Sequence, residues 1–419
     1  MGRKLLIAIV ASIVAAVATV LIFEGGAANV YFIGRFFLGA LQMLIVPLVM
    51  LSVTSGITEL GDVRKLGRLG AGTVIFYFGT MLAAVLVGLI LVELLSPGLG
   101  VDTAGLALKA SKAVKDVGFS EVLLNAVGHN IVASMANMDI LPVIVFSLMF
   151  GIVLSTLGER GQPLVQVIDI ANDVMMGMVH VVMWLAPLGI FGLVAGRFGK
   201  AIAAGGMAAF IAQISAIGSF VVAVLVGLAI HALITLPLLL KLIGKHDVLG
   251  YVRGVSPALL TAFSTASSSA TLPVTIDAVI ENNKVDRRAA RFVLPLGATV
   301  NMDGSALYEA MAAMFIAQAA GISLTWGQRA MVALVSTLSA VGAAGIPEAG
   351  LVTMVMVLKA VKLPLGGLEL LLPVDWFLDR FRTAVNVWGD AVGAGVMERW
   401  ADHAPASQTP SDGDEAAEK

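Results

Sequence analysis

The chain has 419 residues, of which 58% are hydrophobic and 13% are charged. A water-soluble domain carries about 25% charged residues, so lipid is expected to cover much of this protein's surface. The net charge of −2 provides no basic surface for nucleic acid. Cysteine is absent and the five histidines show no close metal-ligand spacing, which excludes disulfides, thiol catalysis and thiolate metal sites.

Apolar stretches of membrane-spanning length recur in the first 242 residues, and about 20 such residues cross a bilayer. We expect helices over 4–23, 36–58, 72–95, 139–157, 164–194 and 208–242. The first stretch could also be a signal peptide, but its length and the stretches that follow favour a helix. Basic residues before the first helix, and Arg64, Lys65 and Arg68 after the second, predict a cytoplasmic N-terminus. The segment 96–120 is then an extracellular loop.

The pattern changes after residue 242, where small and polar residues interrupt the apolar stretches. Two hairpin-like segments have tips at 267–273 and 342–347, and each precedes a long apolar helix, over 292–320 and 374–397. Repeated Gly/Pro-interrupted segments of this kind are typical of transporter binding sites; two ordinary kinked helices are the alternative. The tail is rich in Pro, Ser, Asp and Glu and is expected to be disordered.

The last apolar helix carries a single polar face. Its members are Asp375, Asp379, Arg382, Thr383, Asn386 and Asp390. Their spacing places them on one side of a helix, and charges at membrane depth usually face a cavity or a partner. Arg382 suits a side-chain carboxylate, Asp379 an ammonium group and Asn386 an α-carboxylate. Asp390 suits a hard cation such as sodium, although a purely structural salt-bridge stripe is the alternative.

The preceding helix contains a second polar run, from Asn301 to Ser305. Gly304 and its polar neighbours weaken the helix, and local unwinding would free carbonyl oxygens for a cation while Asp303 supplies negative charge. Glu309 lies one turn further on. Because burial favours the neutral form of a lone carboxyl group, Glu309 is a candidate proton carrier; a hydrogen-bonded structural role is the alternative.

Two long motifs make the sequence recognisable. Asn301-Met-Asp-Gly-Ser-Ala-Leu-Tyr-Glu309 and Asp375-Trp-Phe-Leu-Asp-Arg-Phe-Arg-Thr-Ala-Val-Asn-Val-Trp-Gly-Asp390 resemble those of the dicarboxylate/amino acid:cation symporter family, the glutamate transporters. Both motifs look more like the animal members than the archaeal ones. An archaeal member of this family is one of the transporters in which paired Gly/Pro-interrupted segments form the binding site. The resemblance covers essentially the whole chain after its N-terminus.

The resemblance implies a role for each matching residue. The substrate would contact Ser267, Ser268, Ser305, Asp379, Arg382, Thr383 and Asn386, with the gate of the second hairpin at Ile346 to Gly350. One sodium ion would use Gly297, Asn301, Asn386 and Asp390; a second would use Thr299, Ala340, Val341 and Ala343; a third would use Tyr77, Thr80, Asn301 and Asp303. Glu309 matches a proton-carrying glutamate. Met81 stands where relatives place Thr or Ser beside the third site, so two or three sodium ions are expected.

The fold implied is an all-α polytopic membrane protein with eight transmembrane helices, two re-entrant helical hairpins and inverted repeats. The expected parts are scaffold helices 1 and 2 (1–71), transport-domain helix 3 (72–96), scaffold helices 4 and 5 with transport-domain helix 6 (97–242), the first re-entrant hairpin with broken helix 7 (256–320), the second hairpin with helix 8 (327–398) and the disordered tail (402–419). The resemblance also implies a homotrimer, and the lack of long extracellular insertions suggests a prokaryotic inner (plasma) membrane.

The function expected is symport of acidic amino acids, L-glutamate or L-aspartate, with sodium. Proton cotransport and potassium countertransport are further hypotheses. A neutral amino acid:sodium symporter and a purely proton-coupled dicarboxylate or glutamate symporter remain alternatives. Arg382 argues against the neutral amino acid carrier, and Asp379 argues against a pure dicarboxylate carrier, whose substrate has no ammonium group. An enzyme, such as an intramembrane protease, is disfavoured because no Gly-x-Ser-x-Gly pattern or histidine accompanies the serines at 267–269. A passive channel would lack saturable, selective flux.

Overall fold

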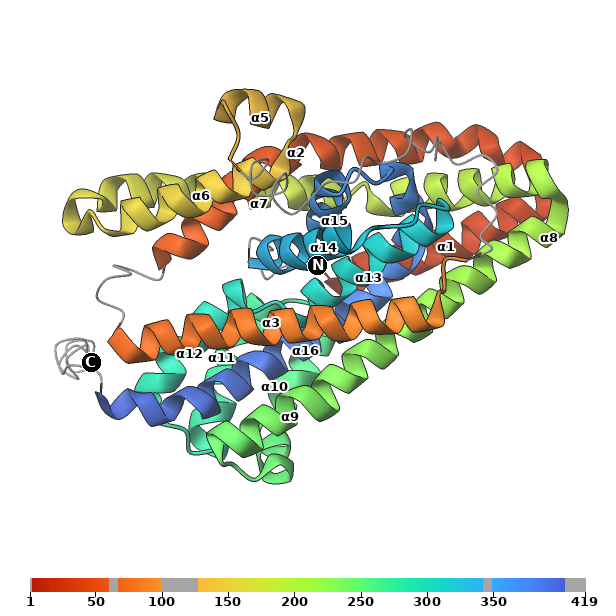
Figure 1. Ribbon diagram of the computed structural model, residues 1–419. Coiled ribbons are helices and arrows are strands. Elements are labelled where there is room, and N and C mark those ends of the chain that lie inside the picture. Colours follow the sequence, from red (N-terminus) through yellow and green to blue (C-terminus); the bar gives the residue numbers. More distant parts are fainter. Residues whose placement is uncertain (1, 60–66, 100–126, 342–348, 404–419) are drawn as a thin grey trace.

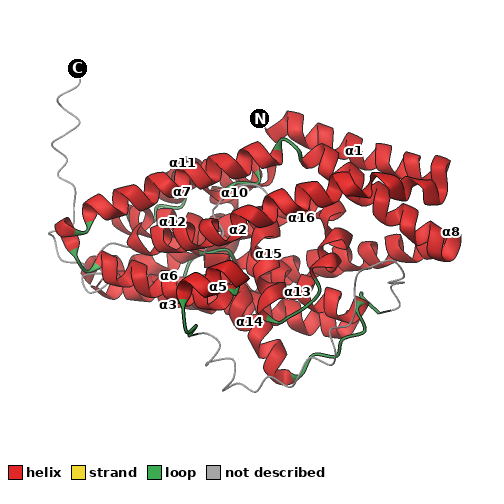
Figure 2. Cartoon of the chain, turned by 90° about the horizontal axis from the view of Figure 1, so that it is seen from above, coloured by secondary structure: helices red, strands yellow, loops and turns green. Residues whose placement is uncertain are grey.

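The computed structural model describes residues 2–59, 67–99, 127–341 and 349–403. Every regular element in these ranges is a helix (Figure 2), which confirms the all-α prediction. The tail from residue 404 and most of the expected loop at 96–120 lie outside the described residues.

The first helices follow the apolar stretches with small shifts at their ends. They are α1 (Gly2–Phe23), the short 3-10 helix η1 (Glu24–Val30), α2 (Tyr31–Glu59), α3 (Gly67–Leu95), α5 (Ile131–Asn137), α6 (Ile140–Ser155) and α7 (Gln162–Met183). The expected single helix over 164–194 is wrong, because α7 ends at Met183 and α8 (Ala186–Ile230) begins three residues later. Pro187 has no backbone N–H to continue α7 but fits the first turn of a new helix.

Helix α8 joins two parts of the molecule. Its helical path breaks at a kink at Gly206, where φ is 69° and ψ is −163°, and this break lies between the expected helices that end at 194 and begin at 208. Only glycine adopts such a conformation without strain. Figure 1 shows the two segments of α8 running back along different layers of the molecule, the first beside α2 and the second beside α3.

The second half contains shorter and more interrupted helices. After the wide turns η4 (His231–Thr235) and η5 (Leu240–Gly244) on either side of α9 (Leu236–Leu239) come α10 (Val248–Thr265), α11 (Ser268–Asp277), α12 (Arg287–Val300), α13 (Asp303–Ala319), α14 (Trp326–Val341), α15 (Ala349–Ala360) and α16 (Leu368–Met397). α10 packs against α11, and α14 against α15, so each pair forms a helical hairpin. Both hairpins pack against α16, and α16 also contacts α12 and α13.

Small residues allow α8 to approach α2 closely. A Cβ atom on Gly189 would lie 2.3 Å from Phe37 Cγ, and one on Gly196 would lie 2.6 Å from Tyr31 Cβ. Helices in lipid associate mainly through such close packing, because apolar side chains are as well solvated by lipid as by each other. The glycines of α8 therefore explain the tight contact between these two helices.

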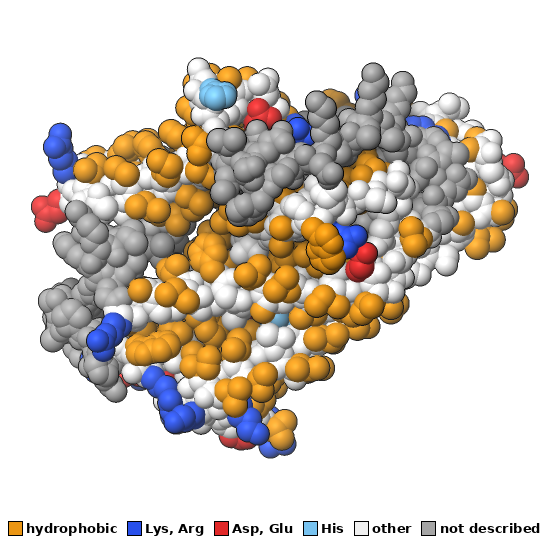
Figure 3. Space-filling view, in the orientation of Figure 1, with side chains coloured by type: hydrophobic (Ala, Val, Ile, Leu, Met, Phe, Trp, Pro, Cys, Tyr) orange, Lys and Arg blue, Asp and Glu red, His pale blue; other side chains and the backbone are white. Residues whose placement is uncertain are grey.

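The surface is that of a protein in lipid. Figure 3 shows hydrophobic side chains spread over the visible face, with most of the lysine and arginine side chains near its edges. On α3, Ile75 and Leu94 are 73% and 75% exposed. In the part of the chain that the structure describes, four helical stretches are long and apolar enough to span a membrane: Ile7–Ala40, Arg68–Leu95, Gln162–Val182 and Ala186–Gly244. These features agree with a polytopic membrane protein.

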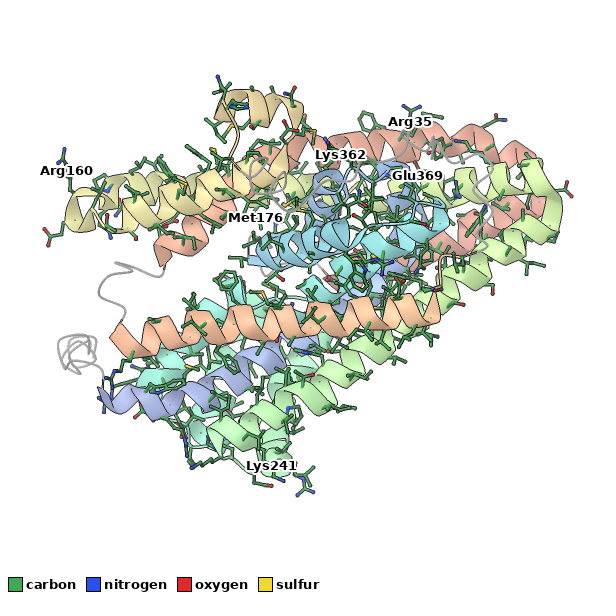
Figure 4. The ribbon with its side chains drawn as sticks, in the orientation of Figure 1. Arg35, Arg160, Met176, Lys241, Lys362 and Glu369 are labelled. Atoms are coloured by element: carbon green, nitrogen blue, oxygen red, sulfur yellow. The ribbon has the colours of Figure 1, made fainter. Side chains whose placement is uncertain are left out.

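A polar contact links α16 to the first helices. The Tyr31 hydroxyl donates a hydrogen bond to Glu369, and the Lys200 ammonium lies 3.2 Å from the centre of the Tyr31 ring. Figure 4 places Arg35 and Glu369 at the same end of the molecule, remote from Lys241. The first turn of α16 is thereby held against α2 and α8.

Candidate functional site

The polar face of α16 is buried, with Arg382 at its centre. The Arg382 side chain is 0% exposed, and its Nη2 lies 2.8 Å from Asp379 Oδ1 and 3.1 Å from Asp375 Oδ1. Asp379 lies one turn and Asp375 two turns before Arg382 on α16, so helix geometry alone brings the three side chains to one face. Because two carboxylates face one guanidinium, an additional cation or ammonium group would be accommodated beside Asp379.

Two neighbouring helices shape the surroundings of the guanidinium. Its Cζ lies 4.1 Å from the centre of the Tyr308 ring on α13, a cation–π distance. Nε and Nη1 of Arg382 have no hydrogen-bond partner among the described residues. A Cβ atom on Gly350 would lie 2.5 Å from Nη1, so a larger residue at this position of α15 would displace the guanidinium. The arrangement leaves donor groups for an incoming carboxylate.

Asn386 joins the polar face of α16 to the start of α13. Its Oδ1 accepts a hydrogen bond from the Gly304 N–H at 2.7 Å, and its Nδ2 lies 3.4 Å from Ser305 Oγ and 3.2 Å from Met302 Sδ. The Thr383 hydroxyl donates to the Asp379 carbonyl at 2.8 Å, which leaves its oxygen as an acceptor. Four predicted substrate residues, Ser305, Arg382, Thr383 and Asn386, therefore lie on facing surfaces of α13 and α16.

The chain leaves the helical conformation between α12 and α13. Asn301 has φ −92° and ψ 83°, and Met302 has φ −108° and ψ 55°. The interruption comes before Gly304, which is itself helical and has another role. A Cβ atom on Gly304 would lie 2.6 Å from the Arg382 carbonyl oxygen, so glycine permits the close approach of α13 to α16.

Oxygen-bearing side chains gather around the interruption. Asn301 Nδ2 donates to Asp390 Oδ1 at 3.0 Å, and the Thr80 hydroxyl donates to Asn301 Oδ1 at 3.3 Å. A Cβ atom on Gly297 would lie 2.4 Å from Asp390 Oδ1 and 2.6 Å from Tyr77 Oη. The Gly297 carbonyl accepts the Asn301 N–H at 2.9 Å. Five predicted sodium-site residues are thus brought together from α3, α12 and α16.

Asp303 lies on the other side of the same cluster. Its side chain is 0% exposed, its Oδ2 lies 3.1 Å from His231 Nε2, and its Oδ1 has no hydrogen-bond partner among the described residues. A Cβ atom on Gly389 would lie 2.6 Å from Asp303 Oδ2 and 2.7 Å from Asn301 Nδ2. Gly389 therefore lets the two side chains meet against α16.

Glu309 is buried where α13 meets the second hairpin. Its side chain is 0% exposed, and its Oε2 accepts a hydrogen bond from the Ser339 hydroxyl of α14 at 2.5 Å. Oε1 has no partner of its own in the hydrogen bonds of the described residues. Protonation or deprotonation of this carboxyl group would therefore change its hydrogen bond with α14.

The first hairpin carries its serines at the turn between α10 and α11. Ser267 caps α11 by accepting a hydrogen bond from the Ala270 N–H at 3.2 Å, and Ser268 follows it in the first turn; both are buried. Arg380 Nη1 donates to the carbonyls of Phe263 and Ser264 at 3.0 and 2.8 Å. α16 thereby holds the C-terminal end of α10. A cationic side chain is favourable there because a helix C-terminus carries partial negative charge.

Several predicted residues are not joined to this cluster. Ala340 and Val341 are buried at the end of α14, but Ala343 and Ile346 lie outside the described residues. The Thr299 hydroxyl donates to the Leu296 carbonyl at 3.1 Å. The second sodium site and the gate therefore stay predictions. Met81 is 0% exposed next to Thr80 and brings no oxygen to the cluster.

Sequence reasoning missed three neighbours of the site. His231, Tyr308 and Ser339 contact Asp303, Arg382 and Glu309 respectively. A histidine in an otherwise apolar stretch is a signal for the first, because an imidazole in such surroundings needs a polar partner. Tyr308 was visible within the 301–309 motif, whereas nothing local marks Ser339.

The donor set fits a hard cation. Asp303 Oδ1 is a buried carboxylate oxygen without a partner in the described structure, and the oxygens of Thr80, Asn301 and Asp390 surround the same interruption. Oxygen ligands of this kind suit alkali and alkaline-earth ions rather than transition metals. Within the described residues, moreover, no group of three or more His, Asp or Glu side chains is placed to hold a metal.

Comparison with known proteins agrees with this chemistry. The sodium:dicarboxylate symporter family matches residues 1–400. An excitatory amino acid transporter of Caenorhabditis elegans is 40% identical over 410 residues, which cover 87% of this chain and 80% of the relative. Human excitatory amino acid transporter 3 is 38% identical (88% and 78% covered), and excitatory amino acid transporter 1 of Ambystoma tigrinum is 36% identical (89% and 77% covered). The chain therefore belongs to the sodium:dicarboxylate symporter family.

Proposed function

We propose that this protein is a secondary active symporter of acidic amino acids, L-aspartate or L-glutamate, coupled to sodium. Members of its family are transporters, not enzymes. The observation that carries the proposal is the buried Arg382, paired with Asp379 and linked through Asn386 to the oxygen cluster around Asn301. A guanidinium beside an ammonium acceptor matches an amino acid that carries a second carboxylate.

The same arrangement supports a coupling mechanism. Asp303 and Asp390 are buried carboxylates, and unpaired charge in a low-dielectric interior is costly. Sodium bound beside them would neutralise this charge and order the 301–305 segment. The substrate residue Ser305 is part of this segment, and the substrate residue Asn386 binds to it. Substrate and sodium then stabilise the same closed state, which is how binding of one raises affinity for the other. We propose two or three sodium ions per substrate.

Proton cotransport and potassium countertransport form a finer part of the proposal. Glu309 contacts Ser339 of the second hairpin, so its protonation would alter the contact between α13 and that hairpin. The proton on Glu309 would move inward together with the anionic substrate. On the return step, potassium would take the place of that proton. This assignment follows from family likeness and from the burial of Glu309.

The assembly and the transport motion are also proposals. We infer a homotrimer in the bilayer of the inner (plasma) membrane, with a cytoplasmic N-terminus. Helices α1, α2, α6 and α7 would form a static scaffold. α3, the two hairpins, the broken helix formed by α12 and α13, and α16 would move as a transport domain in an elevator-type alternation of access, with the segment around Gly350 as the gate.

Uptake of radiolabelled L-aspartate, L-glutamate and L-serine into proteoliposomes tests the proposal, with sodium, proton and potassium gradients imposed one at a time. We expect saturable uptake of the two acidic amino acids that requires external sodium, with serine excluded. Empty liposomes and liposomes with sodium on both sides are the controls.

Each other result points to a different function. Uptake driven by a proton gradient without sodium would replace the sodium assignment by a proton-coupled carrier. Preferential uptake of serine would make the protein a neutral amino acid:sodium symporter and overturn the role of Arg382. Potassium inside the vesicles should accelerate uptake if countertransport occurs, and an equal rate without it would remove that part.

A further inference from the structure

A buried histidine touches the ion cluster from outside the motifs that define the site. His231 Nε2 lies 3.1 Å from Asp303 Oδ2, and both side chains are 0% exposed. A carboxylate oxygen only accepts hydrogen bonds, so the hydrogen lies on Nε2 of His231. Nδ1 has no hydrogen-bond partner among the described residues. The hydrogen bond to Asp303 is therefore the only one that the imidazole forms among the described residues.

The backbone next to His231 forms a wide turn that is tied to α16. η4 (His231–Thr235) is a π-helical turn, in which the Leu236 N–H bonds to the His231 carbonyl five residues earlier. Pro237 follows and has no N–H for the Ala232 carbonyl. The Trp388 indole supplies that hydrogen bond instead, at 3.0 Å. Wide turns of this type occur frequently at functional sites.

These contacts fix His231 between two parts of the site. Trp388 precedes Gly389, whose missing side chain leaves room for Asp303 Oδ2 and Asn301 Nδ2. The histidine is thus held on one side through Ala232 and α16, and it holds Asp303 on the other. With Oδ2 occupied, only Oδ1 of Asp303 remains without a partner in the described structure. The carboxylate is oriented before any ion arrives.

We propose that His231 is a positioning residue for sodium coupling, which donates through Nε2 to Asp303 Oδ2 so that Oδ1 faces the cation. The inference rests on the proposed sodium-coupled function and assigns a role to a residue outside the expected ligand set. Without this donor the carboxylate must be ordered by the ion itself, which weakens ion binding. Removing a hydrogen-bond partner of a metal ligand typically costs about 10–100-fold in metal affinity.

Three substitutions of His231 separate hydrogen bonding from packing. His231→Gln places an N–H donor at nearly the same distance from the backbone as Nε2. His231→Asn keeps a donor but shortens its reach, and His231→Leu keeps an apolar volume without a donor. We expect the sodium concentration for half-maximal effect to rise about tenfold or more in the Leu and Asn variants, and to stay within about threefold of the parent in the Gln variant.

The measurement is a sodium chloride titration of the full-length purified transporter, without amino acid, read as the shift in thermal unfolding midpoint. Choline chloride keeps ionic strength constant. Uptake provides a second readout: the half-saturating sodium concentration should rise while the aspartate KM at saturating sodium stays near the parent value. His246→Leu is the matched control, because His246 Nε2 contacts Gly395 O and Glu398 at 3.2 and 3.0 Å, away from the cluster.

The outcomes are distinguishable. An unchanged sodium titration in His231→Leu would overturn the positioning role, and so would an equal loss in the Leu and Gln variants, because the donor would then be irrelevant. Rescue by Gln but not by Asn supports it, even if the Leu variant fails to fold. If sodium changed neither the thermal unfolding midpoint nor the uptake rate of the parent protein, the proposed function itself would be overturned.

Discussion

Two groups of helices in this protein bury polar residues in contrasting ways. In α2 and α6 the buried polar side chains are serines and threonines, and Thr54, Thr58 and Ser147 bond to carbonyls of their own helices. In α13 and α16 the buried polar side chains include Asp303, Asp379 and several other charged groups. Such hydroxyls need no partner from another helix, whereas buried charges do.

The difference shows which helices carry the function. A buried charge in a membrane protein is expensive and persists mainly where a ligand, ion or partner requires it. Each carboxylate in α13 and α16 has at least one neighbour that compensates it, for example Arg382 for Asp379 and Asn301 for Asp390. Hydrogen bonding is incomplete at Asp303 and Glu309, which each retain an oxygen without a partner in the described structure, and at Asp375, whose two oxygens have no hydrogen-bond partner there. Asp375 still has the Arg382 guanidinium at 3.1 Å, whereas Asp303 and Glu309 pair with no arginine in the described structure, and these two are where the proposed cations would act.

Removing the central cation should have the largest effect. Arg382→Cys leaves Asp375 and Asp379 without their shared partner, and breaking a buried ion pair costs about 3–5 kcal/mol. Saturable aspartate uptake should fall by about 100-fold or more, and neutral amino acids such as serine should become substrates. Parallel uptake assays with labelled aspartate and serine measure both changes.

Arg287→Ala is the matched arginine control, because Arg287 forms an exposed ion pair with Glu281 and such pairs contribute little. Its uptake should equal that of the parent. If Arg382→Cys kept the parent's aspartate affinity, the guanidinium would not be the carboxylate receptor, and the contrast between the two groups of helices would lose its functional meaning.

Much of this contrast could be predicted from the sequence because it depends on helical periodicity. The spacing from Asp375 to Asp390 puts the polar residues on one face of α16 whatever the fold. The break in the helix near Asn301 was also predictable, although the structure places it before Gly304 rather than at that glycine. Local chemistry within one or two turns determines both features.

Contacts between distant helices could not be predicted in this way. His231 and Asp303 are 72 residues apart, and Tyr31 and Glu369 are 338 apart. Their meeting depends on the kink at Gly206 and on how the layers pack, which periodicity does not encode. The role of Gly389 was hidden for the same reason, since a glycine in a helix reveals nothing about what lies opposite it.

Gly389→Ala should sharpen the comparison at the ion cluster. The added methyl group would lie 2.6 Å from Asp303 Oδ2 and 2.7 Å from Asn301 Nδ2, so at least one of the two must move. Overpacking of this kind costs about 1–3 kcal/mol. A cost of this size in the ion-bound state corresponds to a rise of about 5- to 160-fold in the half-saturating sodium concentration. Sodium titration of uptake at saturating aspartate measures it.

Gly218→Ala in α8 is the control for that change. A Cβ atom there would meet nothing within 4 Å, and alanine favours helix over glycine by about 1 kcal/mol. Sodium dependence should be unchanged and the unfolding midpoint equal or higher. A normal sodium titration in Gly389→Ala would mean that Asp303 and Asn301 do not need their present positions for ion binding.

The smallest effect is expected in the helices that carry no buried charge. Ser55 of α2 donates to Asp169 Oδ1 of α7 at 2.6 Å, a contact between helices remote in sequence from the ion cluster. Ser55→Ala should reduce the free energy of unfolding by about 1 kcal/mol and leave the sodium and aspartate KM values unchanged.

Ser147→Ala is the matched control with an even smaller effect, because the Ser147 hydroxyl bonds only within α6. A changed sodium KM in Ser55→Ala would contradict the division, since it would extend ion coupling into α2 and α7.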